Sequence, residues 1–66
     1  MNIADRLKQL RTDKNMTQQQ LADVLGINQG MLSRWESGAT APSLKLRRSI
    51  ADYFKMSVDE IFGNNI

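Results

Sequence analysis

The sequence predicts an all-α protein, a compact bundle of five helices that forms one domain over residues 1–66. Two observations support this fold class. No segment alternates apolar and polar residues for long enough to make a strand. Apolar residues instead recur at the three- and four-residue spacing of amphipathic helices, and residues that cap helices precede several of these stretches. Because a domain of this size buries only about 60% of the surface that its unfolded chain exposes, its stability margin is thin.

The first helix is expected over residues 3–14, with Asn2 as its N-cap. Its buried stripe consists of Ile3, Leu7 and Leu10. Arg11 lies at the edge of that stripe, where a charged side chain needs a partner, because burying an unpaired charge is costly.

The second helix is expected to start after Thr17, which forms a capping box with Gln20. Met16 and Leu21 occupy the positions of a hydrophobic staple. The stretch from residue 18 to residue 37 then looks like two short helices joined by a tight turn. Ala22 is small enough for the two helices to approach closely, and Gly26 suits the left-handed backbone of the turn.

The third helix is expected to follow Asn28 as N-cap and to end at Gly38, a left-handed residue, with Ile27 and Leu32 as a second staple. At about 100° per residue, its two faces differ in character. One face is small or hydrogen-bonding and carries Gln29, Gly30, Ser33, Arg34 and Ser37. The other face carries Met31, Leu32, Trp35 and Glu36. Such a stripe alone is also typical of an ordinary amphipathic surface helix.

The fourth helix is expected from about Ser43 to Lys55, because Pro42 disfavours a helical residue before it. Its expected core residues are Leu44, Ile50, Ala51 and Phe54. A capping box of Ser57 and Glu60, with Met56 and Ile61 as staple positions, predicts a short last helix that Gly63 ends. Residues 64–66 are expected to fray.

Composition narrows the possible functions. The chain has no cysteine and no histidine, so it lacks a disulfide framework and the usual zinc ligands, and we expect neither a metal site, nor a cofactor, nor an enzyme. No apolar run approaches the roughly 20 residues that cross a bilayer, which favours a cytoplasmic protein. Residues 1–55 carry a net charge of +4 and residues 56–66 a net charge of −2. This asymmetry favours an anionic partner for the first part of the chain.

Several short motifs together resemble the lambda-repressor and Cro superfamily, the Xre type of helix-turn-helix. They are T-Q-x-x-L-A (17–22), G-I-N (26–28), W-E-x-G (35–38), P-S (42–43), I-A-x-x-F (50–54) and S-V-D-E-I-F (57–62). The resemblance implies a sequence-specific regulator of transcription, most typically a repressor. It implies a homodimer that binds a palindromic site in double-stranded DNA at the nucleoid, without a membrane or a small-molecule ligand. Two alternatives stay open: the DNA-binding domain of a longer repressor, and an antitoxin or other interaction protein with the same fold.

Matching the chemistry of the major groove to this sequence gives candidate contacts. Arg34 has the planar fork that pairs with guanine, and Gln29 can pair with adenine. The residues expected to read bases are Gln29, Gly30, Ser33 and Arg34. Those expected to contact phosphates are Gln18, Asn28, Ser37, Thr40 and Lys45. For Gln18 and Asn28 a role as plain helix-start residues is an equal alternative, Ser33 also fits a solvated serine, and Trp35 fits the core.

The resemblance also implies a shielded ion pair between Arg11 and Glu36, which ties the first helix to the end of the third. For the dimer interface it implies the apolar residues near the C-terminus, Val58, Ile61 and Phe62, as partly core and partly available. Arg47 departs from the family pattern, since relatives often have an apolar residue there. It is expected either to snorkel along the core or to contact DNA or a partner.

Overall fold

The computed structural model describes residues 2–63. This part of the chain forms four α-helices and one short helical turn, joined by short connections. In order they are α1 (Ile3–Asp13), α2 (Gln18–Leu25), α3 (Gln29–Ser37), α4 (Leu44–Phe54) and η1 (Asp59–Gly63). No strand occurs within these residues, and the all-α fold with five helical elements is confirmed. The expected fraying of residues 64–66 lies outside the described residues.

Each helix begins at a residue whose side chain replaces a missing backbone partner. Asn2, Asn28 and Ser43 each accept a hydrogen bond from the backbone N–H three residues later, at 2.8, 2.7 and 3.4 Å. The two predicted capping boxes are present. In one, Thr17 and Gln20 exchange backbone and side-chain bonds, and in the other, Ser57 and Glu60 do the same. A cap of this kind contributes about 1 kcal/mol, so these residues define the helix boundaries.

Left-handed backbone ends α2 and α3 at the two glycines where the sequence predicts it. Gly26 has φ 73° and Gly38 has φ 86°, and neither position strains a residue without a Cβ. Lys55, which ends α4, has φ 57° although it is not glycine. The end of α4 therefore carries backbone strain of about 1 kcal/mol.

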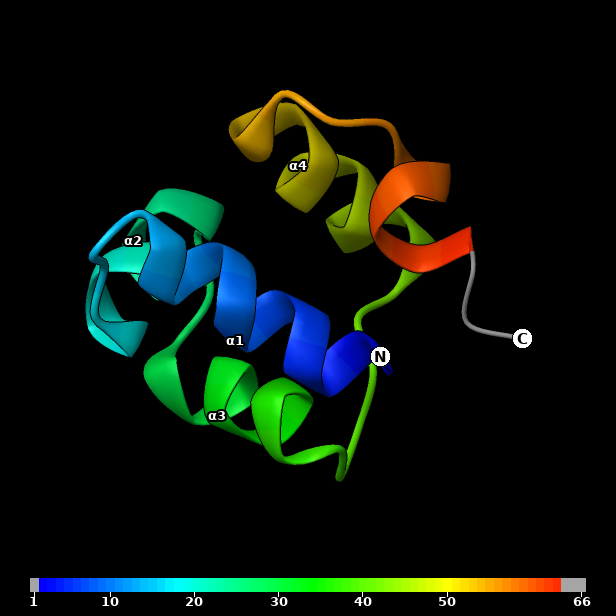
Figure 1. The fold of residues 1–66 in the computed structure, drawn as a ribbon. Helices are drawn as coiled ribbons and strands as arrows, with labels where there is room; N and C mark the ends of the chain where they lie inside the picture. Colours follow the sequence, from blue (N-terminus) through cyan, green and yellow to red (C-terminus); the bar gives the residue numbers. More distant parts are fainter. Residues whose placement is uncertain (1, 64–66) are drawn as a thin grey trace.

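The core lies where the helices meet. Leu7, Leu21, Leu32 and Ile50 come one each from α1 to α4 and are fully buried. α1 packs against α3 and η1, and α2 packs against α3 and α4 (Figure 1). Every helix thus buries one apolar face, and the outer face of α3 stays free.

The expectation that Leu44 belongs to the core is wrong. Its side chain is 59% exposed. Helical periodicity places Leu44 near the buried Ala51, but Leu44 is the first residue of α4 and lies at the end of the buried stripe. Pro42 and the half-buried Leu46 cover that end of the core instead.

η1 closes the core through residues that were expected to be partly available. Ile61 and Phe62 are 4% and 5% exposed, so the expectation that they offer surface to a second copy is wrong, and only Val58 of the three stays half-exposed. Arg47 explains part of this burial. Its Nε donates to the Pro42 carbonyl at 2.9 Å, and its guanidinium carbon lies 5.3 Å from the centroid of the Phe62 ring. The aliphatic part of the Arg47 side chain therefore packs along the core, and its guanidinium group covers the Phe62 ring.

Candidate nucleic-acid interface

The turn between α2 and α3 sets the position of the exposed helix. Ala22 is fully buried where the two helices meet, and its carbonyl accepts a hydrogen bond from the Ile27 N–H at 3.0 Å. Gly26 supplies the left-handed residue that this turn requires. Leu32 and Trp35 then anchor α3 in the core, Trp35 being only 3% exposed. Trp35 is thus a packing residue and is not available for stacking on a base.

The outer face of α3 is exposed along its whole length. The five residues on it are Gln29, Gly30, Ser33, Arg34 and Ser37, and all are exposed. The face carries one positive charge, amide and hydroxyl groups and no large apolar side chain. This face is therefore suited to hydrogen bonding with a hydrated, polar surface and not to packing against another apolar face.

Gly30 is not required by packing. A Cβ built there would meet Asn28 Oδ1 at 3.4 Å, an ordinary van der Waals contact. Glycine inside a helix costs roughly 0.5 to 1 kcal/mol relative to alanine. Glycine at this position therefore makes α3 less stable than alanine would, and it leaves the backbone between Gln29 and Ser33 without a side chain on the exposed face.

The end of α3 is fixed to α1 by an ion pair. Arg11 Nε donates to Glu36 Oε2 at 2.8 Å, and Arg11 Nη2 donates to Glu36 Oε1 at 3.0 Å. The two side chains are 11% and 4% exposed. Arg11 Nη1 also donates to the Met16 carbonyl at 2.7 Å, which ties in the loop before α2. The hydrogen bonds with Glu36 raise the pKa of Arg11, so this guanidinium is charged at any working pH.

A chain of amide hydrogen bonds leads from this ion pair to the exposed face. Gln18 Nε2 donates to Glu36 Oε1 at 3.1 Å, and Gln29 Nε2 donates to Gln18 Oε1 at 3.3 Å. The sequence reasoning placed Gln18 on a phosphate and missed both contacts. The signal was present, since Gln18 and Gln29 are the first residues of consecutive helices, and a tight helix-turn-helix brings such residues together.

The other expected contact residues lie around this face. Asn28 caps α3 through Oδ1, so the helix-start role is observed. Ser37 Oγ donates to the Arg34 carbonyl at 3.1 Å and accepts from the Ala39 N–H at 3.4 Å. Thr40 and Lys45 are both exposed after α3. The exposed face of α3 is thus flanked, from the start of α3 to the start of α4, by Asn28, Ser37, Thr40 and Lys45.

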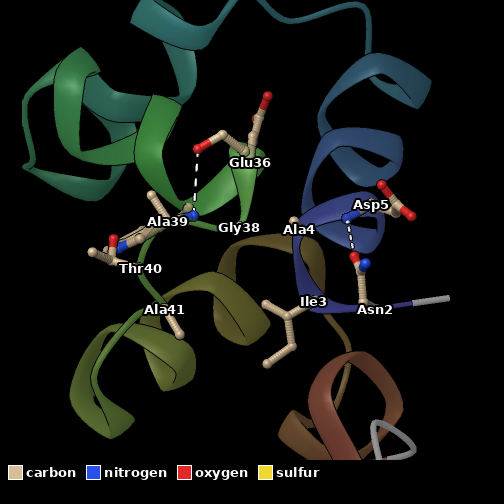
Figure 2. A pocket seen from close by; sticks show the side chains of 11 residues that line it. Asn2, Ile3, Ala4, Asp5, Glu36, Gly38, Ala39, Thr40 and Ala41 are labelled. Atoms are coloured by element: carbon tan, nitrogen blue, oxygen red, sulfur yellow. Dashed lines mark hydrogen bonds between the residues drawn. The ribbon is translucent and has the colours of Figure 1, made fainter.

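A hollow of about 620 Å³ opens beside the end of α3. Figure 2 shows Asn2 and Ile3 at the start of α1 on one side, and Ala39 to Ala41 after α3 on the other. The lining is mostly small side chains and backbone, and the Glu36 carboxylate is already held by Arg11 and Gln18. Across residues 2–63 no cluster of acidic, histidine or cysteine side chains is arranged to hold a metal ion, and no helix is long and apolar enough to span a membrane.

The helix-turn-helix family profile matches residues 7–61. The chain belongs to the helix-turn-helix family. The match includes α2, the turn and α3, together with most of α1 and the start of η1. The helix-turn-helix that the sequence motifs indicate is confirmed.

The curated relatives of this helix-turn-helix chain include both a transcriptional activator and a transcriptional repressor. It is 39% identical over 63 residues to the transcriptional activator BcrR of Enterococcus faecalis, covering 96% of this chain and 31% of that protein. It is 38% identical over 63 residues to the cryptic phage CTXphi transcriptional repressor RstR of Vibrio cholerae, covering 96% of this chain and 56% of that protein. The chain therefore spans from just under a third to just over half the length of these relatives.

A solved structure has the same fold. The P22 c2 repressor, crystallised in complex with a synthetic operator, superposes with a TM-score of 0.88 and covers 100% of this chain and 98% of that chain. The two sequences are 18% identical, so the similarity concerns the fold of this helix-turn-helix domain.

Proposed function

We propose that this chain binds double-stranded DNA in a sequence-specific way and regulates transcription, with α3 inserted into the major groove. The observation that carries this proposal is the asymmetry of α3. Its inner face is locked into the core by Leu32 and Trp35, while its outer face carries hydrogen-bonding side chains and no large apolar one. The major groove admits one α-helix and displays a distinct donor and acceptor pattern for each base pair. The regulators among its relatives and the operator-bound P22 c2 repressor support this function.

Base readout is assigned to the exposed face of α3. Arg34 presents a planar pair of donors to O6 and N7 of guanine. Gln29 presents an amide to N6 and N7 of adenine. Ser33 contacts a base edge or a nearby phosphate, and Gly30 lets the backbone approach the bases closely.

Phosphate contacts are assigned to the residues around that face. Gln18 and Asn28 lie at the starts of α2 and α3, where unpaired backbone N–H groups and the helix dipole favour an anion. Ser37, Thr40 and Lys45 flank the other end of α3. These contacts position the protein on the duplex, whereas the contacts of Gln29 and Arg34 specify the sequence.

We further propose that the protein binds as a homodimer on a palindromic site. Half-sites about 34 Å apart place two recognition helices on one side of the duplex, and one short helix alone offers few base contacts. Leu44, 59% exposed, provides an apolar surface for the dimer together with Val58. Arg47, one helical turn after Leu44, overlies Phe62 of η1, so Leu44 lies on the side of α4 that faces η1.

Exposed charges of opposite sign on α4 and η1 suit pairing about a two-fold axis. Arg48 is exposed on α4, and Asp59 and Glu60 are exposed on η1. In a two-fold interface each patch faces its complement on the second copy. Light scattering on the parent should report a dimer on DNA, and Leu44→Lys should shift it to a monomer. Equal masses for both proteins would count against this surface.

Of the two signs of regulation, we propose repression, as in RstR, by occupation of an operator at the nucleoid of the cytoplasm. The protein acts by binding and not by catalysis. Selection of binding sites from random duplex DNA tests the whole proposal. We expect an inverted repeat whose half-sites are separated by about one helical turn, 10 to 10.5 base pairs. Failure to enrich any sequence would refute sequence-specific binding.

A further inference from the structure

The chain of hydrogen bonds that ends at Gln29 begins at a group that can only accept. Glu36 is 4% exposed at its side chain and accepts three hydrogen bonds, two from Arg11 and one from Gln18. A guanidinium only donates, and a carboxylate paired with it has only acceptor oxygens. The polarity of this first link is therefore fixed by chemistry and does not depend on how an amide is oriented in the structure.

This fixed link determines how the Gln18 amide is turned. Its Nε2 must face Glu36 Oε1, at 3.1 Å, because turning the amide around would bring two acceptor oxygens together with no proton between them. The Gln18 Oε1 atom consequently faces away from Glu36, toward Gln29. There it accepts from Gln29 Nε2 at 3.3 Å.

The hydrogen bond to Gln18 in turn fixes how the Gln29 amide is oriented. One of its two amide hydrogens is used by Gln18, so the exposed edge of its amide presents one acceptor, Oε1, and one remaining donor. Adenine presents the complementary pair in the major groove, the N6 donor beside the N7 acceptor. Guanine presents two acceptors, O6 and N7, which demand two donors. A Gln29 amide held by Gln18 cannot meet that demand.

We propose that Glu36 is a specificity-determining positioning residue: through Gln18 it holds the Gln29 amide in the one orientation that accepts adenine and rejects guanine. This inference rests on the proposed DNA-binding function. Glu36 itself lies away from the exposed face of α3 and contacts no base. Its effect on sequence preference passes through two side-chain amides.

Glu36→Gln tests the proposal, because it keeps the size of the side chain but gives it both a donor and an acceptor end. The Gln18 amide can then take either orientation, and Gln29 is released. Binding is measured on four duplexes that differ only at the base pair where Gln29→Ala flattens the preference. The parent should prefer adenine over guanine there by about tenfold or more. In Glu36→Gln that preference should fall to within about twofold, while the preference at the base pair read by Arg34 persists.

Asp23→Asn is the control, since it makes the same carboxylate-to-amide change at an exposed residue of α2 that accepts a hydrogen bond from Gln19 and is assigned neither to the DNA nor to the dimer surface. It should leave both preferences unchanged. If Glu36→Gln fails to fold, Arg11→Met/Glu36→Gln removes the guanidinium that has lost its partner and is expected to show the same relaxed preference. A folded variant of either kind that retains the tenfold preference for adenine would overturn the proposal, as would an equal loss of preference at every base pair. A parent protein without any sequence preference would instead refute the proposed function.

Discussion

The ion pair between Arg11 and Glu36 makes the stability of this domain depend on one buried contact. Glu36→Ala removes three hydrogen bonds, two from Arg11 and one from Gln18, and leaves a guanidinium that is only 11% exposed without its counter-charge. Breaking a buried pair in this way costs about 3 to 5 kcal/mol. Arg11 keeps its hydrogen bond to the Met16 carbonyl, so we expect a value near the lower end of this range.

A loss of about 3 kcal/mol lowers the Tm of a domain of 60 to 100 residues by about 12 to 24 °C. Thermal and urea unfolding followed by circular dichroism measure this loss. Arg11→Met/Glu36→Leu should recover most of the stability, because an apolar pair avoids the desolvation of both charges. If Glu36→Ala melts within a few degrees of the parent, the reasoning about the buried guanidinium is refuted.

The pH dependence of this contribution follows from the direction of the pKa shift. Because Glu36 raises the pKa of Arg11, the stabilisation is present below the pKa of an unfolded arginine and is lost as the pH rises through the folded value. That loss falls in strongly alkaline solution, so the difference in unfolding free energy between parent and Glu36→Ala should stay constant across neutral pH. A difference that changes between weakly acidic and weakly alkaline buffer would contradict this assignment.

Four further substitutions separate recognition from stability. Arg34→Ala should weaken binding to the selected site by about 1 to 3 kcal/mol and flatten the preference at one base pair, and equal loss on specific and random duplexes would exclude direct readout. Gln18→Ala should weaken binding to all sequences and also relax the preference at the base pair that Gln29 reads, because Gln29 loses its hydrogen bond to Gln18. Gly30→Ala should stabilise the fold by roughly 0.5 to 1 kcal/mol in urea unfolding, because the added Cβ meets only an ordinary van der Waals contact. A destabilised variant would mean that the backbone of α3 needs glycine at this position. Lys55→Gly should raise the Tm by a few degrees, because it relieves the strain of about 1 kcal/mol that a residue with a Cβ has in left-handed backbone. An unchanged or lower Tm would show that Lys55 is not strained.

Local chemistry made much of this fold predictable from the sequence. Thr17 with Gln20, and Ser57 with Glu60, form capping boxes at the predicted positions, and Gly26 and Gly38 end their helices in left-handed backbone. Such features depend on residues a few positions apart, so a pattern of residue types is enough to find them.

Features that depend on tertiary packing were harder to predict. Periodicity places Leu44 on the buried face of α4, but it does not show where the neighbouring elements stop covering that face. Phe62 is covered by Arg47, for which the sequence left open whether the side chain follows the core or contacts DNA or a partner. The contacts of Gln18 with Glu36 and Gln29 join residues 18 and 11 positions apart, so they follow only from the helix-turn-helix arrangement and not from the local sequence.

Methylation interference on the selected DNA site tests most directly whether α3 reads the major groove. Dimethyl sulfate methylates guanine at N7, in the major groove, and adenine at N3, in the minor groove, so one reagent probes both faces of the same duplex. We expect N7 methylation within each half-site to block binding, whereas N3 methylation should not, and Arg34→Ala should become insensitive to methylation of one of the guanines. Interference from adenine N3 alone, or from no position in the half-sites, would contradict insertion of α3 into the major groove.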